Sequence, residues 1–196
     1  NMGTFVNVFI LPYFAHEMMG VSTVTLGMFL LLSSLGISIF APIGGYISDR
    51  FGTGPVTVMG MLIVAVGLFS YTTLSSEATI TEVAIRMIVV GGGMGMFQSS
   101  NLSLIMGKMR PQNLGAGGAL SSISRGMGCV SAVALLGGLF TTIYATSGLG
   151  VDILSASYNR ESSTAYVDAF GTVYAAACGL TVVGMVTSVV AWQADR

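Results

Sequence analysis

Residues 45–55 read GYISDRFGTGP and place a short polar stretch between two long apolar ones. Asp49 and Arg50 lie at its centre, and Gly45 and Gly52 flank them. The apolar stretches on both sides are long enough to cross a bilayer, for which about 20 mostly apolar residues are needed. The polar stretch therefore predicts a tight turn between two transmembrane helices.

Composition extends this prediction to the whole chain of 196 residues. Hydrophobic residues make up 53% of the chain and charged residues only 8%, and the mean hydropathy is +0.84. Soluble domains do not have this composition, so membrane lipid is the expected surrounding. The net charge of −1 and the lack of a basic run exclude nucleic acid as a partner, because binding phosphates requires clustered Lys and Arg.

Apolar length and polar punctuation predict an all-α fold of six transmembrane helices, which form a single bundle over residues 1–196. The predicted spans are 3–19, 23–47, 55–75, 80–107, 114–145 and 165–193. The apolar part of the first span is short for a crossing unless further residues precede it. We therefore expect the chain to be part of a longer one.

The distribution of basic residues orients this bundle, because Lys and Arg accumulate in short cytoplasmic loops. The connections on one side carry Arg50, Lys108 and Arg110, with Arg196 at the end, whereas those on the other side carry only Arg160. Both ends of the segment are thus expected in the cytoplasm. Tyr71 is then expected in an aromatic belt at the outer boundary.

Glycine is abundant, at 27 residues, and gathers in residues 91–95, 115–118 and 126–128. Helices in lipid gain no hydrophobic energy from association, so they pack through small residues that allow close backbone approach. These runs predict close helix contacts.

The polar stretch resembles the signature loop of the major facilitator superfamily, through Gly45, Asp49, Arg50 and Gly52. The two basic residues that follow in the family pattern are replaced by Thr53 and Gly54. The resemblance implies that the loop acts as an inner latch between two bundles. Turn chemistry alone is the alternative, in which Asp49 favours the positive end of the next helix dipole and Gly45 lets a neighbouring helix approach.

Pro111, Gly115, Arg125 and Gly128 extend this resemblance to the carboxy-terminal six-helix half of a drug:proton antiporter of the fourteen-helix branch. It implies a secondary active transporter of the plasma (inner) membrane that works by alternating access. The expected activity is proton-coupled efflux of lipophilic or cationic small molecules. A second six-helix bundle, from the same chain or another subunit, is expected to complete the substrate cavity.

Arg125 is the ionisable residue expected deepest in the membrane, about eleven residues or roughly 16 Å into the fifth span. Gln98 and Asn101 in the fourth span lie at a similar depth. Charged residues inside a membrane face a bundle interior, a cavity or a partner. Arg125 is therefore expected either to line the cavity and meet an anionic group or to anchor a polar network with Gln98 and Asn101.

Glu82, Arg86 and Asp168 are predicted to form a second charged group near the outer ends of the fourth and sixth spans. Glu82 and Arg86 have the favourable i,i+4 order for an ion pair. The cluster is either a solvated surface feature or an outer gate whose ion pairs break when the cavity opens outward.

Enzymatic chemistry is not predicted, because no catalytic triad, phosphate-binding loop after a strand or metal-ligand cluster is present. No cofactor and no metal are expected, and Cys129 and Cys178 are interpreted as packing residues. No Asp or Glu is expected near the bilayer midplane, so a coupling carboxylate would come from the other bundle. This absence also leaves open a second hypothesis, a non-transporting membrane scaffold or assembly subunit on the same fold.

Overall fold

A computed structural model describes residue 11 and residues 21–73, 79–146 and 160–194, without the side chains at 140, 144–146, 160–169, 191 and 194. Its helices are α2 (Thr23–Phe51), α3 (Thr53–Tyr71), α4 (Ile80–Gly107), α5 (Leu114–Thr146) and α6 (Arg160–Ala194), with a short 3-10 helix, η1 (Pro111–Asn113), before α5. No strand occurs in these ranges. The predicted span 3–19 lies outside the described residues, apart from Leu11.

Five of these helices contain stretches that are long and apolar enough to cross a membrane. The coarse prediction of an all-helical, multi-pass membrane protein is therefore confirmed. Three helix bounds differ from the prediction by four or five residues: α2 continues beyond residue 47 to Phe51, α3 ends at Tyr71 rather than 75, and α6 begins at Arg160 rather than 165. Ser48, Asp49 and Arg50 are compatible with a helix, and the helix ends only where Gly52 takes a φ of +93°.

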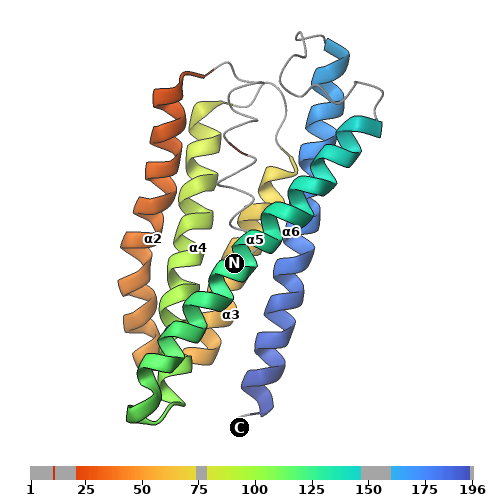
Figure 1. Cartoon of the computed structure of the whole chain (residues 1–196). Helices are drawn as coiled ribbons and strands as arrows, with labels where there is room; N and C mark the ends of the chain where they lie inside the picture. The colour runs from red at the N-terminus through yellow and green to blue at the C-terminus, as the bar shows by residue number, and fades with distance from the viewer. Residues whose placement is uncertain (1–10, 12–20, 74–78, 147–159, 195–196) are drawn as a thin grey trace.

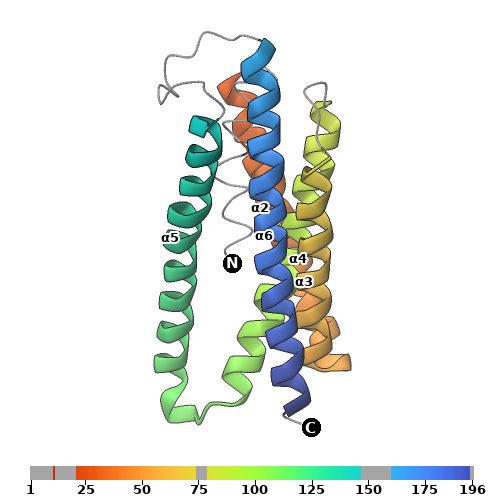
Figure 2. The same ribbon diagram turned by 90° about the vertical axis from the view of Figure 1, so that its right-hand side faces the viewer.

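Helix α4 is the centre of the bundle, with α2 against one side and α3 against another, while α6 packs on α3. Figure 1 shows α5 crossing this group diagonally, and Figure 2 shows it standing apart from the other helices over most of its length. Only its first turns approach α4 closely, after the tight connection through η1. Among the described helices α5 is the least closely packed, and its main described contact is with α6.

Glycines bring α4 into backbone contact with both of its main partners. A Cβ added at Gly95 would lie 2.6 Å from the carbonyl oxygen of Ile37 in α2, and one at Gly60 would lie 2.7 Å from the backbone nitrogen of Phe97. The prediction of close contacts is thus confirmed for residues 91–95. In α5 it is wrong for Gly115 and Gly126, which have no neighbour within 4 Å in the described part of the chain.

Three aromatic rings join α3 and α6 at the end of the bundle where α3 finishes. The ring centroids of Tyr71 and Tyr174 are 4.9 Å apart, and those of Phe170 and Tyr174 are 4.5 Å apart. All three side chains are fully buried. The expectation that Tyr71 lies in an interfacial belt is therefore wrong, because α6 supplies an aromatic partner that covers its ring.

The outward faces of the helices are apolar. Val24 of α2 is 70% exposed, Val130 of α5 is 72% exposed and Val183 of α6 is 61% exposed. Such surfaces are unfavourable in water and are the expected contact with lipid or with further transmembrane helices. The chain is thus built as an integral membrane bundle rather than as a water-soluble one.

Candidate functional site

A cavity of about 470 Å³ lies between α4 and α5, with one wall residue from α2. Its lining residues are Ala41, Phe97, Gln98, Ser99, Asn101, Leu102, Ile105, Met109, Gly117, Leu120, Ser121, Ser124 and Arg125. Gln98, Asn101, Leu102 and Ile105 follow the spacing of a single face of α4. The volume is within the range of small-molecule sites, roughly 300–1,000 Å³.

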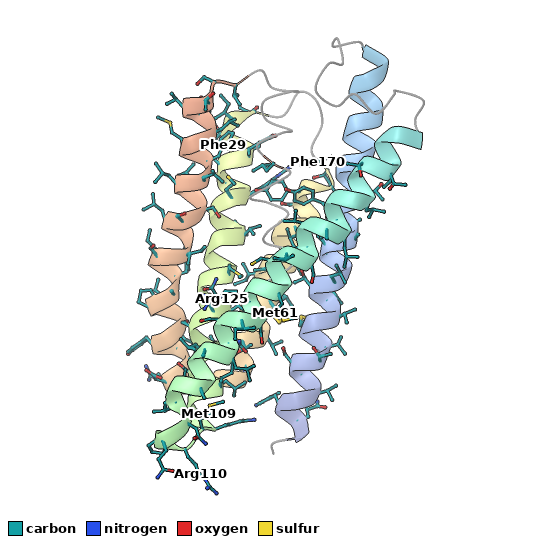
Figure 3. All side chains as sticks on the ribbon, in the orientation of Figure 1. Phe29, Met61, Met109, Arg110, Arg125 and Phe170 are labelled. Carbon is teal, nitrogen blue, oxygen red and sulfur yellow. The ribbon has the colours of Figure 1, made fainter. Side chains whose placement is uncertain are left out.

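Arg125, labelled in Figure 3, lines this cavity from α5 and contacts α4. Its Nη1 donates a hydrogen bond to Oε1 of Gln98, over 3.3 Å. The structure therefore brings together two residues that their depth in the sequence placed at the same level. Asn101 lines the same cavity, but no hydrogen bond joins its side chain to Arg125 in the described chain.

Arg125 is the single ionisable residue among those that line the cavity. Its side chain is exposed, and the amide of Gln98 is a neutral partner that does not balance the charge of the guanidinium. No carboxylate is among the described residues that line the cavity. The other N–H groups of the Arg125 guanidinium can therefore donate hydrogen bonds to an acceptor that the described residues do not supply.

Ser121 and Ser124 of α5 and Phe97 of α4 also line the cavity, although the sequence did not single them out. Ser121 could have been predicted to line the cavity, because it lies one turn before Arg125 on the same face of the helix. The sequence could not predict on which side of α4 Phe97 lies, because that helix is apolar on most of its faces.

A smaller cavity of about 200 Å³ lies among α3, α4 and α6. It is lined by Gly54, Thr57, Asn101, Leu104, Thr187, Ser188 and Trp192. The hydroxyls of Thr57 and Thr187 donate hydrogen bonds to carbonyl oxygens of their own helices, over 2.7 and 2.8 Å. Asn101 lines both cavities and marks where they approach one another on α4.

The signature loop is a sharp corner between α2 and α3. Gly52 ends α2 with φ +93° and ψ 151°, and its N–H donates to the carbonyl oxygen of Ser48 over 2.9 Å. Asp49 and Arg50 are both exposed, and the guanidinium of Arg50 lies 5.9 Å from the ring centroid of Phe51. The latch requires a second bundle and remains a prediction.

Two details of the loop differ from the turn chemistry expected for it. Asp49 lies within the last turns of α2, and no side chain caps the first turn of α3. Gly45 has no described neighbour within 4 Å, whereas a Cβ at Gly44 would lie 2.7 Å from the Cα of Met96. The helix contact expected at Gly45 is therefore made by Gly44, because the preceding residue is the one that faces α4.

The second charged group is not assembled in the described part of the chain. Glu82 is exposed in the first turn of α4. Arg86 is half-buried, with an Nη1 that has no hydrogen-bond partner, and no ion pair joins it to Glu82 among the described residues. Asp168 belongs to α6, but its side chain lies outside the description. The choice between surface cluster and gate stays a prediction.

Comparison with known proteins identifies a family and several related transporters. The family model described as Major Facilitator Superfamily matches residues 1–133. The uncharacterized transporter YebQ of Escherichia coli is 31% identical over 148 residues, which are 75% of this chain and 32% of that protein. The riboflavin transporter RibZ of Clostridioides difficile is 24% identical over 92% of this chain and 38% of its own length.

A further relative is the multidrug transporter protein MdtP of Bacillus subtilis, which is 25% identical over 70% of this chain and 25% of its own length. The chain thus spans between a quarter and two fifths of the length of these relatives. The matched region includes the signature loop and Arg125. Five helices able to span a membrane, the loop between α2 and α3 and the family match together identify the chain as a member of the major facilitator superfamily.

Proposed function

We propose that this chain is one bundle of a secondary active transporter that exports lipophilic small molecules in exchange for protons. The observation that carries the proposal is the cavity of about 470 Å³ between α4 and α5, which combines apolar walls with a polar group at Gln98 and Arg125. Cavities of this kind, formed at the centre of helix bundles, are where such transporters bind substrates. A relative named as a multidrug efflux pump, LfrA of Mycolicibacterium smegmatis, supports export as the direction.

A second six-helix bundle is part of this proposal. The described residues that wall the cavity come from α2, α4 and α5 and the short connection between α4 and α5, and the side chain of Arg125 is exposed. An enclosing wall must then come from elsewhere in the same polypeptide or from another subunit. Alternating access would open this cavity to each side of the plasma membrane in turn, with the end that carries Arg50, Lys108 and Arg110 in the cytoplasm.

Proton coupling requires a group that changes its protonation during the cycle. The acidic side chains that the structure describes, Asp49 and Glu82, lie at helix ends and are exposed. The coupling carboxylate is therefore assigned to the second bundle. The same observation is what favours the alternative of a membrane scaffold, in which no coupling group is needed.

The test is transport by the complete native polypeptide in proteoliposomes. An imposed proton gradient should drive the accumulation of lipophilic compounds, and their movement should in turn shift the internal pH reported by an enclosed dye. Collapse of the gradient by an ionophore is the control. Lack of proton-dependent flux for a broad panel of compounds, together with stable co-purification of a partner protein, would instead establish the scaffold.

A further inference from the structure

We propose that the cavity between α4 and α5 selects organic anions, with the negative group of the ligand held by the guanidinium of Arg125. The inference rests on the proposed function, since it names the substrate class of the same cavity. It also replaces the cationic compounds expected from the sequence. The ligand is an apolar or aromatic body that carries one carboxylate or sulfonate.

The charges of the lining residues give the first argument. Arg125 is the only ionisable group among the lining residues, and its described partner is the neutral amide of Gln98 at 3.3 Å. A guanidinium at this depth is costly unless an anion or several acceptors balance it. An organic cation in the same cavity would face a like charge with no carboxylate among the described lining residues to offset it, which disfavours its binding.

The geometry of the polar group gives the second argument. A guanidinium offers parallel N–H donors that match the two oxygens of a carboxylate. Gln98 accepts from Nη1 through Oε1, so its amide nitrogen is left to donate. Gln98 thus holds the guanidinium in place and adds an N–H donor of its own. The N–H donors of Arg125 and Gln98 together match the acceptor oxygens of a carboxylate.

The position of this group gives the third argument. Arg125 is about eleven residues, or roughly 16 Å, from the start of α5, and Gln98 is about 14 Å from the end of α4. Both distances reach the middle of a hydrocarbon layer about 30 Å thick. A charge at an entrance could serve to attract ions, whereas a charge at this depth contacts only a ligand that is already bound.

The rest of the wall determines the body of the ligand. Phe97, Leu102, Ile105 and Leu120 supply apolar surface, and the hydroxyls of Ser121 and Ser124 lie beside Arg125 in the chain. A volume of about 470 Å³ accommodates a compound of two or three fused rings. A planar aromatic anion satisfies both the walls and the guanidinium.

Three naphthalene compounds of nearly the same size test the sign of the charge: 2-naphthoate, its neutral amide 2-naphthamide and the cation 2-naphthylmethylammonium. Binding to the complete purified transporter in detergent is measured by calorimetry. We expect naphthoate to bind about ten- to one-hundred-fold more tightly than the amide, as for a charge-assisted hydrogen bond. The cation should bind more weakly than the amide.

Substitutions of cavity residues then test whether Arg125 causes the preference for the anion. Arg125→Gln should remove the preference of naphthoate over naphthamide, Arg125→Lys should retain part of it, and Val130→Ala, on an exposed face of α5, should leave it unchanged. Ser121→Asp places a carboxylate one turn before Arg125 on the same face of α5 and should shift the preference toward the cation. This variant keeps Arg125 and so tests the proposal even if Arg125→Gln does not fold.

An unaltered anion preference in Arg125→Gln, or a wild-type preference for the amide or the cation, would overturn the assignment. The two proposals fail separately. Proton-driven flux of neutral or cationic compounds without anion selectivity leaves the transporter and removes the anion site. A clear anion preference in detergent without any proton-driven flux retains the site and removes proton-coupled export.

Discussion

At Gly95 the backbones of α2 and α4 leave no space for a side chain. A Cβ there would lie 2.6 Å from the carbonyl oxygen of Ile37 and 3.0 Å from the backbone nitrogen of Ala41. Backbone atoms cannot rotate away as a side chain can, so Gly95→Ala must separate the helices. We expect a loss of about 1–3 kcal/mol, measured as a lower midpoint of thermal aggregation by fluorescence-detected size-exclusion chromatography.

Gly179→Ala is the matched control for this substitution. Gly179 lies within α6 with no described neighbour within 4 Å. The same added methyl group should leave the midpoint unchanged or raise it, because alanine favours a helix over glycine by about 1 kcal/mol. Equal midpoints for the two variants would show that contact at Gly95 does not hold α2 against α4.

Gly52 is restricted by its backbone rather than by its neighbours. Its φ of +93° and ψ of 151° belong to a region that residues with a side chain rarely adopt, although the nearest described atom to an added Cβ is 3.9 Å away. Gly52→Ala should therefore destabilise the corner by about 1–3 kcal/mol. The readout is the same thermal midpoint, with Gly27→Ala, inside α2 and with no described neighbour within 4 Å, as the control.

Single residues also show what the sequence could predict. Depth alone placed Arg125 level with Gln98, because helix rise is constant, and the hydrogen bond between them agrees with that level. The choice of Gly44 over Gly45 for the α4 contact depends on the rotation of α2 about its axis. An α2 that is apolar on nearly every face contains no pattern that sets this rotation.

At the scale of helices, span positions were predictable because a bilayer demands long apolar runs separated by polar residues. The α2–α3 corner was displaced because Asp49 and Arg50 are polar without being helix breakers, so α2 continues to Phe51. Helix partners could not be predicted. Glycine runs in α4 and α5 look alike in sequence, yet those of α4 touch two helices while Gly126 touches none in the described chain.

The contact of α3 with α6 allows a prediction at this scale. A side chain at Gly54 would overlap the indole ring of Trp192, whose Cγ lies 2.7 Å from the added Cβ. Gly54→Leu should therefore displace this ring and open the packing between the two helices. In a background where Trp192 is the sole tryptophan, its fluorescence should become more accessible to acrylamide quenching and its emission should shift.

Gly27→Leu is the control for a bulky side chain placed on a glycine without neighbours, and it should leave the emission of Trp192 unchanged. Unaltered quenching in Gly54→Leu would show that the indole of Trp192 does not pack against Gly54. The position of α6 against α3 would then have to be maintained elsewhere, with the buried rings of Tyr71 and Tyr174 as the next contact to test.

For the molecule as a whole, α5 is the least closely packed of the described helices in Figure 2, and it carries the one ionisable residue among the described residues that line the cavity. An exposed Arg125 and apolar outer faces are consistent with one wall of a larger protein. Sequence reasoning could not reach the substrate, because the proposed second bundle would supply part of the cavity lining. On this side, Arg125 is the one ionisable residue among the described residues that line the cavity, and it contributes a positive charge.

The orientation of the bundle gives the last prediction. Helix α4 has 28 residues and a length of about 42 Å, enough to cross the bilayer between Thr79 and Arg110. Because Arg50, Lys108 and Arg110 lie at the same end, that end should face the cytoplasm. With Cys129 and Cys178 replaced by serine, Thr79→Cys should react with an impermeant maleimide on intact cells, and Arg110→Cys only after permeabilisation. The opposite pattern would invert the bundle, and labelling of both from outside would mean that α4 does not cross.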